Sequence, residues 1–175
     1  MEKAIWVNHQ YLKTADPSIV AVELAWHLRK LNVDPTAGPK LEDVIVAQRE
    51  RTKTLVEMAE KSAFFYSELT TYNEKDAAKH LDANGVAVLG ELATKLSALK
   101  EWTMPILHDT VNGFATDKGL GLGKIAQPIR VAVAGMAISP PIDQTLALLG
   151  RERTLARLNA AVQFATKRDS SLRSE

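Results

Sequence analysis

Apolar residues recur every third or fourth position through much of this chain, and this spacing constrains the fold more than any other feature. Two series follow it, at residues 89–99 and 155–165. Such spacing gathers apolar side chains on one face of an α-helix. Nowhere do five or six residues rich in β-branched types alternate strictly between turn signals, as a strand would. We therefore predict an all-α protein.

Helix boundaries can also be predicted. Residues 43–65 contain neither proline nor glycine, which predicts one long helix. Thr103 is placed to cap a second helix with Pro105 in its first turn, and Gly119 to end that helix in the left-handed conformation. Gly150 separates two further helices.

Two polar stretches interrupt the helical pattern. NVDPTAGPK, at 32–40, holds two prolines and a glycine and predicts a loop. SELTTYNEKD, at 67–76, is polar and lacks apolar periodicity. We therefore predict two consecutive helical subdomains, 1–68 and 69–175.

Composition excludes several classes of protein. The 175 residues are 46% apolar and 25% charged, which is ordinary for a globular protein. The absence of cysteine excludes disulfides, thiol catalysis and thiolate metal sites. No run approaches the roughly 18 apolar residues of a membrane helix, and no signal peptide begins the chain. We expect a cytoplasmic protein without a membrane partner.

Charge is distributed unevenly. Residues 1–117 hold 13 Lys/Arg against 17 Asp/Glu, whereas residues 118–175 hold 9 against 4. A basic C-terminal part indicates either a surface that meets a polyanion or a solvated helix face.

The stretch GLGLGK, at 119–124, has the letters of a phosphate-binding loop but not its context. A P-loop needs a glycine where Lys118 stands and a hydroxyl where Ile125 stands. The dinucleotide fingerprint must follow a buried strand, and a predicted helix precedes this stretch. We instead expect the glycines to form a turn, with the next helix starting near Lys124 and Pro128 in its opening turns.

Arg51 falls on the apolar face of the predicted long helix, together with Val44, Gln48 and Leu55. Its stem can pack there while its head reaches water. Alternatively, its guanidinium is held for bidentate recognition of an anion or a base edge. Arg130 likewise interrupts an apolar helix.

The remaining chemistry-bearing residues do not form an active site. The four histidines lie far apart, so no metal site is predicted, and no nucleophile or carboxylate pair has persuasive spacing. The aromatic residues, including Trp6, Tyr11, Trp26, Trp102 and Phe114, are expected in the core, although such rings also stack on bases. We predict no catalytic residue.

A turn and a basic cluster mark residues 139–158. The sequence from Ser139 to Pro141 predicts a rigid turn that starts a helix. Arginines follow at 151, 153 and 157 and are suited to contacts with a phosphate backbone or to a solvated face.

These motifs together resemble the C-terminal anticodon-binding region of bacterial glutamyl-tRNA synthetases. GKIAQPIRVAVAGMAISPPIDQTLALLGRERTLARL, at 123–158, is similar to the family's G-K-x-x-Q-P-L-R helix, Ser/Thr-Pro turn and A-L-L-G-K/R-E-R segment. WVNHQYLK and GPKLEDVIVAQRERTKTLVEMAEKSAFFY resemble its earlier segments in the same order. Ala134 stands where many members have threonine.

The resemblance implies a fold, a partner and site residues. It implies helical subdomains of the α-helix cage type, a monomer, and the anticodon loop of glutamate tRNA as partner rather than DNA. By the E-R-x-K-T-L motif, Arg51 would read the last anticodon base, a cytosine, and arginine there implies rejection of glutamine tRNA. The other anticodon residues implied are Arg130, Ser139, Pro140 and Ile142, with Lys124, Arg151 and Arg153 as backbone contacts.

The same resemblance implies what the chain lacks. The family's His-Ile-Gly-His-type and Lys-Met-Ser-Lys-Ser-type signatures, which serve ATP binding, are absent from the 175 residues. We therefore expect no cofactor and no enzyme activity in this chain alone, with ATP and Mg²⁺ bound by a catalytic domain. The alternatives are a helical protein–protein interaction module and, more weakly, a nucleotide-binding enzyme.

Overall fold

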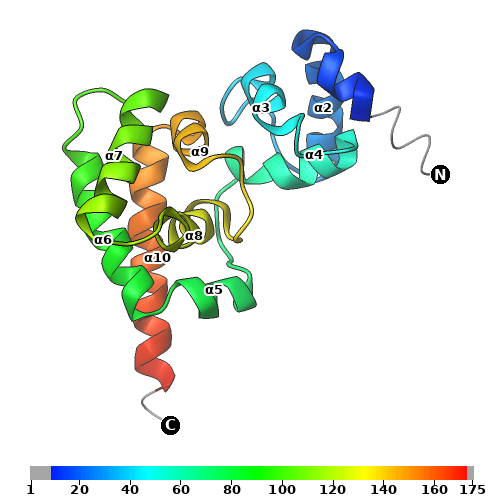
Figure 1. Cartoon of the computed structure of the whole chain (residues 1–175). Helices are drawn as coiled ribbons and strands as arrows, with labels where there is room; N and C mark the ends of the chain where they lie inside the picture. The colour runs from blue at the N-terminus through cyan, green and yellow to red at the C-terminus, as the bar shows by residue number, and fades with distance from the viewer. Residues whose placement is uncertain (1–8, 173–175) are drawn as a thin grey trace. The chain divides into compact units, whose positions relative to one another are not determined.

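The computed structural model describes residues 9–172, except for the side chains of 170–172, and contains helices but no strand in that range (Figure 1). The prediction of an all-α protein is confirmed. The chain divides into two compact units, 1–68 and 69–175. No helix among the described residues is long and apolar enough to cross a membrane.

The first unit is built on helix α2. A helical segment at 9–14 leads into it, and Asp16 caps it by accepting the Ser18 N–H at 2.9 Å. Val20, Leu24 and Leu28 form its fully buried stripe. The helices packed against it are α3 and α4, and the unit's elements are α2 (Pro17–Lys30), α3 (Leu41–Gln48), α4 (Leu55–Ser62) and the 3-10 turn η1 (Ala63–Phe65).

The prediction of one continuous helix over 43–65 is wrong, because the chain breaks between α3 and α4. Thr54 adopts an extended conformation and accepts the Glu57 N–H at 3.1 Å. The Glu57 carboxylate in turn accepts the Lys53 N–H at 2.8 Å. The first bond is the N-cap bond of a capping box, whereas Glu57 reaches back one residue further, to the residue before the cap. A new helix therefore begins at Leu55.

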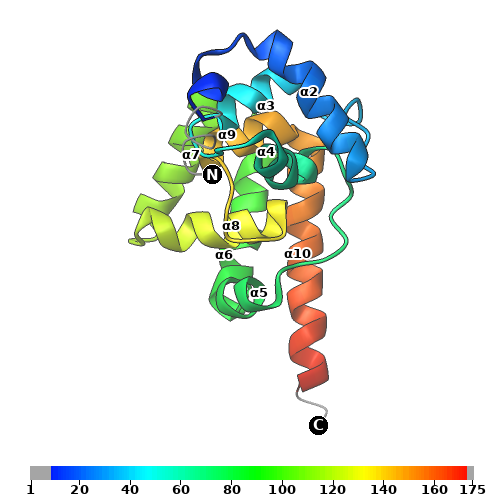
Figure 2. The same cartoon turned by 90° about the vertical axis from the view of Figure 1, so that its right-hand side faces the viewer.

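The second unit surrounds the long helix α10. Figures 1 and 2 show α10 running beside α6 and α8, and all three pack together, with α9 also against α10 and α5 against α8. Leu89, Leu92 and Leu96 of the predicted apolar series are fully buried. The six helices are α5 (Glu74–His80), α6 (Ala83–Ser97), α7 (Met104–Asp117), α8 (Leu122–Ala134), α9 (Ile142–Leu149) and α10 (Arg151–Leu172).

The predicted ends of α7 are confirmed, but the start of α8 differs. Thr103 is the N-cap of α7, and Gly119 follows its end with φ +62°. Helix α8 begins at Leu122 with Gly121 as N-cap, so Pro128 is its seventh residue and lies inside the helix. Only Gly119 of this glycine cluster has a positive φ.

Two aromatic residues expected in the core are instead at the surface. Trp26 is 52% exposed, and the Lys30 Nζ lies 3.6 Å from the centre of its ring. Tyr11 is also exposed. Trp102 is half-buried, and Phe114 is in the core as predicted. Trp6 lies outside the described residues.

Candidate nucleic-acid interface

Arg51 lies in the turn between α3 and α4 rather than on an apolar helix face. The Arg51 backbone N–H donates to the Gln48 carbonyl at 2.8 Å, and the Arg51 carbonyl accepts a hydrogen bond from the Lys61 ammonium at 3.3 Å. The side chain is exposed, and its guanidinium forms no hydrogen bond or ion pair with any residue that the structure describes. The predicted place of Arg51 on an apolar helix face is therefore wrong, because α3 ends at Gln48 and residue 51 lies in the turn that follows.

Hydrogen bonds and an ion pair around Glu57 and Lys61 hold this turn, and the apolar spacing of the sequence did not predict them. The Lys53 N–H and the Lys61 ammonium both bond Glu57, the latter at 2.6 Å, and lower the pKa of that carboxyl. Gln48, buried on α3, donates its side-chain amide to the Lys61 carbonyl at 3.2 Å. The segment that carries Arg51 thus has a defined backbone.

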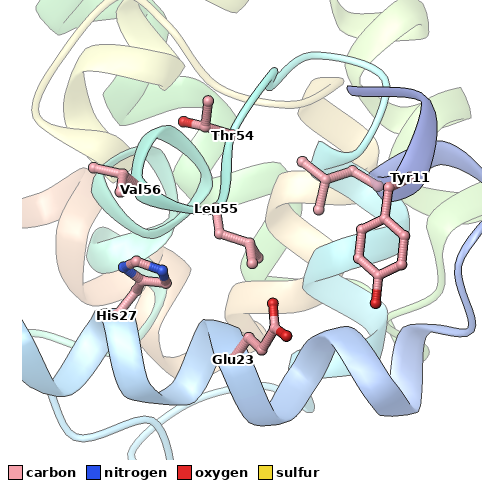
Figure 3. Close-up of a pocket in the computed structure, with 7 residues that line it drawn as sticks. Tyr11, Glu23, His27, Thr54, Leu55 and Val56 are labelled. Atoms are coloured by element: carbon pink, nitrogen blue, oxygen red, sulfur yellow. The ribbon is translucent and has the colours of Figure 1, made fainter. Parts of the chain in front are cut away.

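A pocket of about 460 Å³ opens in the same unit. Figure 3 shows Glu23 and His27 projecting from α2 towards Leu55, with Tyr11 at one side. The pocket combines apolar walls with a carboxylate and an imidazole. Its full lining is Tyr11, Leu12, Glu23, His27, Thr54, Leu55 and Val56.

In the second unit, α8 carries Lys124 and Arg130. Lys124 is exposed in the first turn, whereas Arg130 is half-buried further along the helix. Because Lys124 and Arg130 are six positions apart, their side chains lie on different faces of the helix. Lys124 lines a second pocket of about 530 Å³, together with Lys79 and Lys118.

Three of the predicted anticodon-binding residues lie in the turn after α8 and at the start of the next helix, and all three are buried. Ile142, the first residue of α9, is 7% exposed, and Ser139 and Pro140 are also buried. The Ser139 hydroxyl donates to the Pro140 carbonyl at 2.9 Å, and the Thr145 hydroxyl lies 3.2 Å from the same carbonyl. Their side chains therefore pack within the fold and stabilise the backbone of the turn.

The exposed side chains of that turn are ones the sequence did not single out. Met136 is 39% and Ile138 61% exposed, and Pro141 is exposed too. No local pattern in the sequence distinguishes them, because Ser139 and Pro140 are adjacent and both buried, whereas the exposed Met136 and Ile138 are apolar.

The arginines at the start of α10 differ in role. Arg151 and Arg153 are half-buried, and the Arg151 guanidinium lies 5.5 Å from the centre of the Trp102 ring. Arg157 is only 7% exposed and donates to the carbonyl of Val133. The prediction that Arg157 belongs to a surface cluster of phosphate-binding arginines is therefore wrong, because its guanidinium is buried and bonds the backbone of α8.

Two features that a metal site or a dinucleotide site needs are absent from the described residues. No three His, Cys, Asp or Glu side chains in residues 9–172 gather as metal ligands would. The glycine stretch follows helix α7, so the strand required by a dinucleotide site is absent there. The structure places one candidate, Arg51, in the first unit and the others in the second.

Residues 12–162 match the family model of the anticodon binding domain. The chain therefore belongs to the anticodon-binding domain family. Its relatives are tRNA ligases. It is 44% identical over 170 residues to a glutamate–tRNA ligase of Nitrosococcus oceani, covering 97% of this chain and 36% of that protein. It is 48% identical over 163 residues to one of Alkalilimnicola ehrlichii, covering 93% and 35%.

Solved structures agree with these relatives. The crystal structure of a glutamate tRNA ligase from Elizabethkingia meningosepticum, in complex with its amino acid, superposes with a TM-score of 0.79. It shares 26% identity over 93% of this chain and 32% of that one. The chain thus spans about a third of the length of the ligases that it matches. The resemblance seen in the sequence is confirmed, and the match favours RNA recognition over a protein-interaction module.

Proposed function

We propose that this chain recognises the anticodon loop of glutamate tRNA and supports attachment of glutamate by the catalytic part of a glutamate–tRNA ligase. The observation that carries the proposal is the family match, which extends over both helical units. ATP and Mg²⁺ would be bound outside this region, because none of its sequence motifs, and no grouping of His, Asp or Glu among residues 9–172, suits them. We propose a monomer that is not an enzyme by itself.

Arg51 is the strongest candidate for reading a base. Its exposed guanidinium presents a planar set of donors, and the capped turn fixes the backbone beneath it. RNA loops present unstacked bases whose edges such a group can bond. This geometry supports the role of reading the last anticodon base.

The second unit would hold the rest of the loop. Arg130 is a second base-reading candidate, and Ser139, Pro140 and Ile142 would act by shaping the turn after α8. The exposed Lys124 and the half-buried Arg151 and Arg153 would contact phosphates. The list of roles is consistent with the excess of basic residues at 118–175.

Binding to glutamate and glutamine tRNA transcripts at two salt concentrations tests the proposal. We expect tighter binding of glutamate tRNA, and an affinity for both that falls as salt rises because phosphate contacts release counterions. Lys124→Gln should lower the dependence of log affinity on log salt by about one unit. Equal affinity for the two tRNAs, or none, would contradict the proposed function.

A further inference from the structure

The turn after α8 is tied to the start of α5, more than sixty residues earlier in the chain. The Asp76 carboxylate accepts the Ala137 N–H at 2.8 Å. Three residues before Asp76, the Asn73 N–H donates to the Gly135 carbonyl at 2.7 Å. These two bonds fasten the first residues of the turn to the N-cap and the first turn of α5.

Close packing reinforces this attachment. Gly135 has φ +78°, and a Cβ built on it would lie 2.8 Å from the Leu69 Cδ1 and 3.0 Å from the Thr71 carbonyl oxygen. The turn therefore begins against the 69–73 segment, at a distance only glycine permits. Just before it, buried Arg157 holds the Val133 carbonyl.

The other end of the turn is also fixed. The Thr145 hydroxyl reaches the Pro140 carbonyl at 3.2 Å, and Ser139 and Pro140 are buried. Between these two anchored ends, Met136 and Ile138 remain exposed. An exposed apolar side chain on a stiff support is suited to packing against a splayed nucleobase, because little conformational entropy is lost on contact.

We propose that Asp76 is a positioning residue that fixes the turn 135–141 so that Ile138 packs against an anticodon base other than the one read by Arg51. This inference rests on the proposed function. Asp76 acts through the Ala137 N–H and does not itself contact RNA. Loss of the Asp76 carboxylate removes the hydrogen bond to the Ala137 N–H, so the backbone next to Ile138 becomes more mobile.

The test uses the 175-residue chain and glutamate tRNA transcripts substituted singly at each of the three anticodon positions. Asp76→Ala is compared with Asp76→Asn, whose side-chain oxygen can still accept the Ala137 N–H. Glu74→Ala is the matched control, because Glu74 lies in the same first turn of α5, is exposed, and its carboxylate forms no hydrogen bond or ion pair with a described residue. Ile138→Ala probes the contact directly without disturbing the core.

We expect Asp76→Ala and Ile138→Ala to lose discrimination at the same position, either first or second, with Asp76→Ala losing about tenfold, the loss typical of one ordinary hydrogen bond. Discrimination at the third position should persist in both, and Asp76→Asn and Glu74→Ala should behave as the parent. Equal loss at all three positions, no loss, or losses at different positions for the two variants would overturn the inference. A parent chain that discriminates at no position would instead overturn the proposed function, and the inference with it.

Discussion

Replacement of Gly135 by alanine should lower the free energy of unfolding of the second unit. The loss has two parts, one from backbone strain and one from steric overlap of the new Cβ. Alanine at φ +78° costs about 1 kcal/mol for its left-handed backbone. Its Cβ would also lie 2.8 Å from the Leu69 side chain and 3.0 Å from the Thr71 carbonyl. Overpacking of this kind costs about 1–3 kcal/mol, so we expect a total of about 2–4 kcal/mol.

Gly119→Ala provides the matched control. Gly119 also has a positive φ, +62°, but a Cβ there meets nothing within 4 Å. Its replacement should cost only the backbone component of about 1 kcal/mol. The effect of alanine on the unfolded chain is common to both variants and cancels in the comparison.

Urea unfolding followed by Trp102 fluorescence measures this difference. Trp102 belongs to the second unit, where its indole N–H donates to the Leu146 carbonyl at 2.9 Å. Replacing Trp6 and Trp26 with phenylalanine in all variants makes the signal specific to that unit. Equal free energies of unfolding for the Gly135 and Gly119 variants would refute the claim that the 69–73 segment packs closely against the turn.

The capped turn beneath Arg51 gives two further predictions. Thr54→Ala should lower the free energy of unfolding by about 1 kcal/mol, measured by urea titration of circular dichroism, because the N-cap acceptor of α4 is lost. Glu57→Gln should also destabilise at pH 7. The bonds from the Lys53 N–H and Lys61 depress the pKa of folded Glu57, so its stabilisation is present above its ordinary value of about 4.3 and is lost as pH falls through the lower folded value. The melting temperatures of parent and Glu57→Gln should therefore converge in acid, and a constant difference down to pH 2 would contradict this assignment.

Apolar periodicity was sufficient to predict the helical class and two helices of the second unit, α6 and α10. The series at 89–96 became the buried face of α6, since a local 3.6-residue pattern is what a helix requires. The caps at Thr103 and Gly119 were likewise readable, because capping depends on residues adjacent in sequence.

Two helix boundaries were misjudged for identifiable reasons. The break before Leu55 contains no proline or glycine, yet the Thr54-x-x-Glu57 pattern of a capping box was present in the sequence. Pro128 deprives the Lys124 carbonyl of its usual donor, but it is buried among apolar neighbours of α8, and tertiary packing outweighs that local loss.

The candidate site was predictable as a set of residues but not as a surface. Arg51 was identified by its motif, whereas its exposure depends on the helix break. Ser139, Pro140 and Ile142 proved buried and Met136 and Ile138 exposed, because the turn follows hydrogen bonds to Asp76 and Thr145. Contacts over such sequence separations leave no local pattern, and for the same reason Arg157 could not be distinguished from the surface arginines.

The central claim is that Arg51 reads the last anticodon base. Binding of glutamate tRNA transcripts with C or A at the third anticodon position should be measured for the parent, Arg51→Gln and Lys53→Gln, the last removing an equal charge from an exposed neighbour in the same turn. We expect the parent and Lys53→Gln to prefer C, by the roughly 1–3 kcal/mol typical of one base contact, and Arg51→Gln to lose most of that preference. An Arg51→Gln chain that rejects the C-to-A change as strongly as the parent would contradict the account.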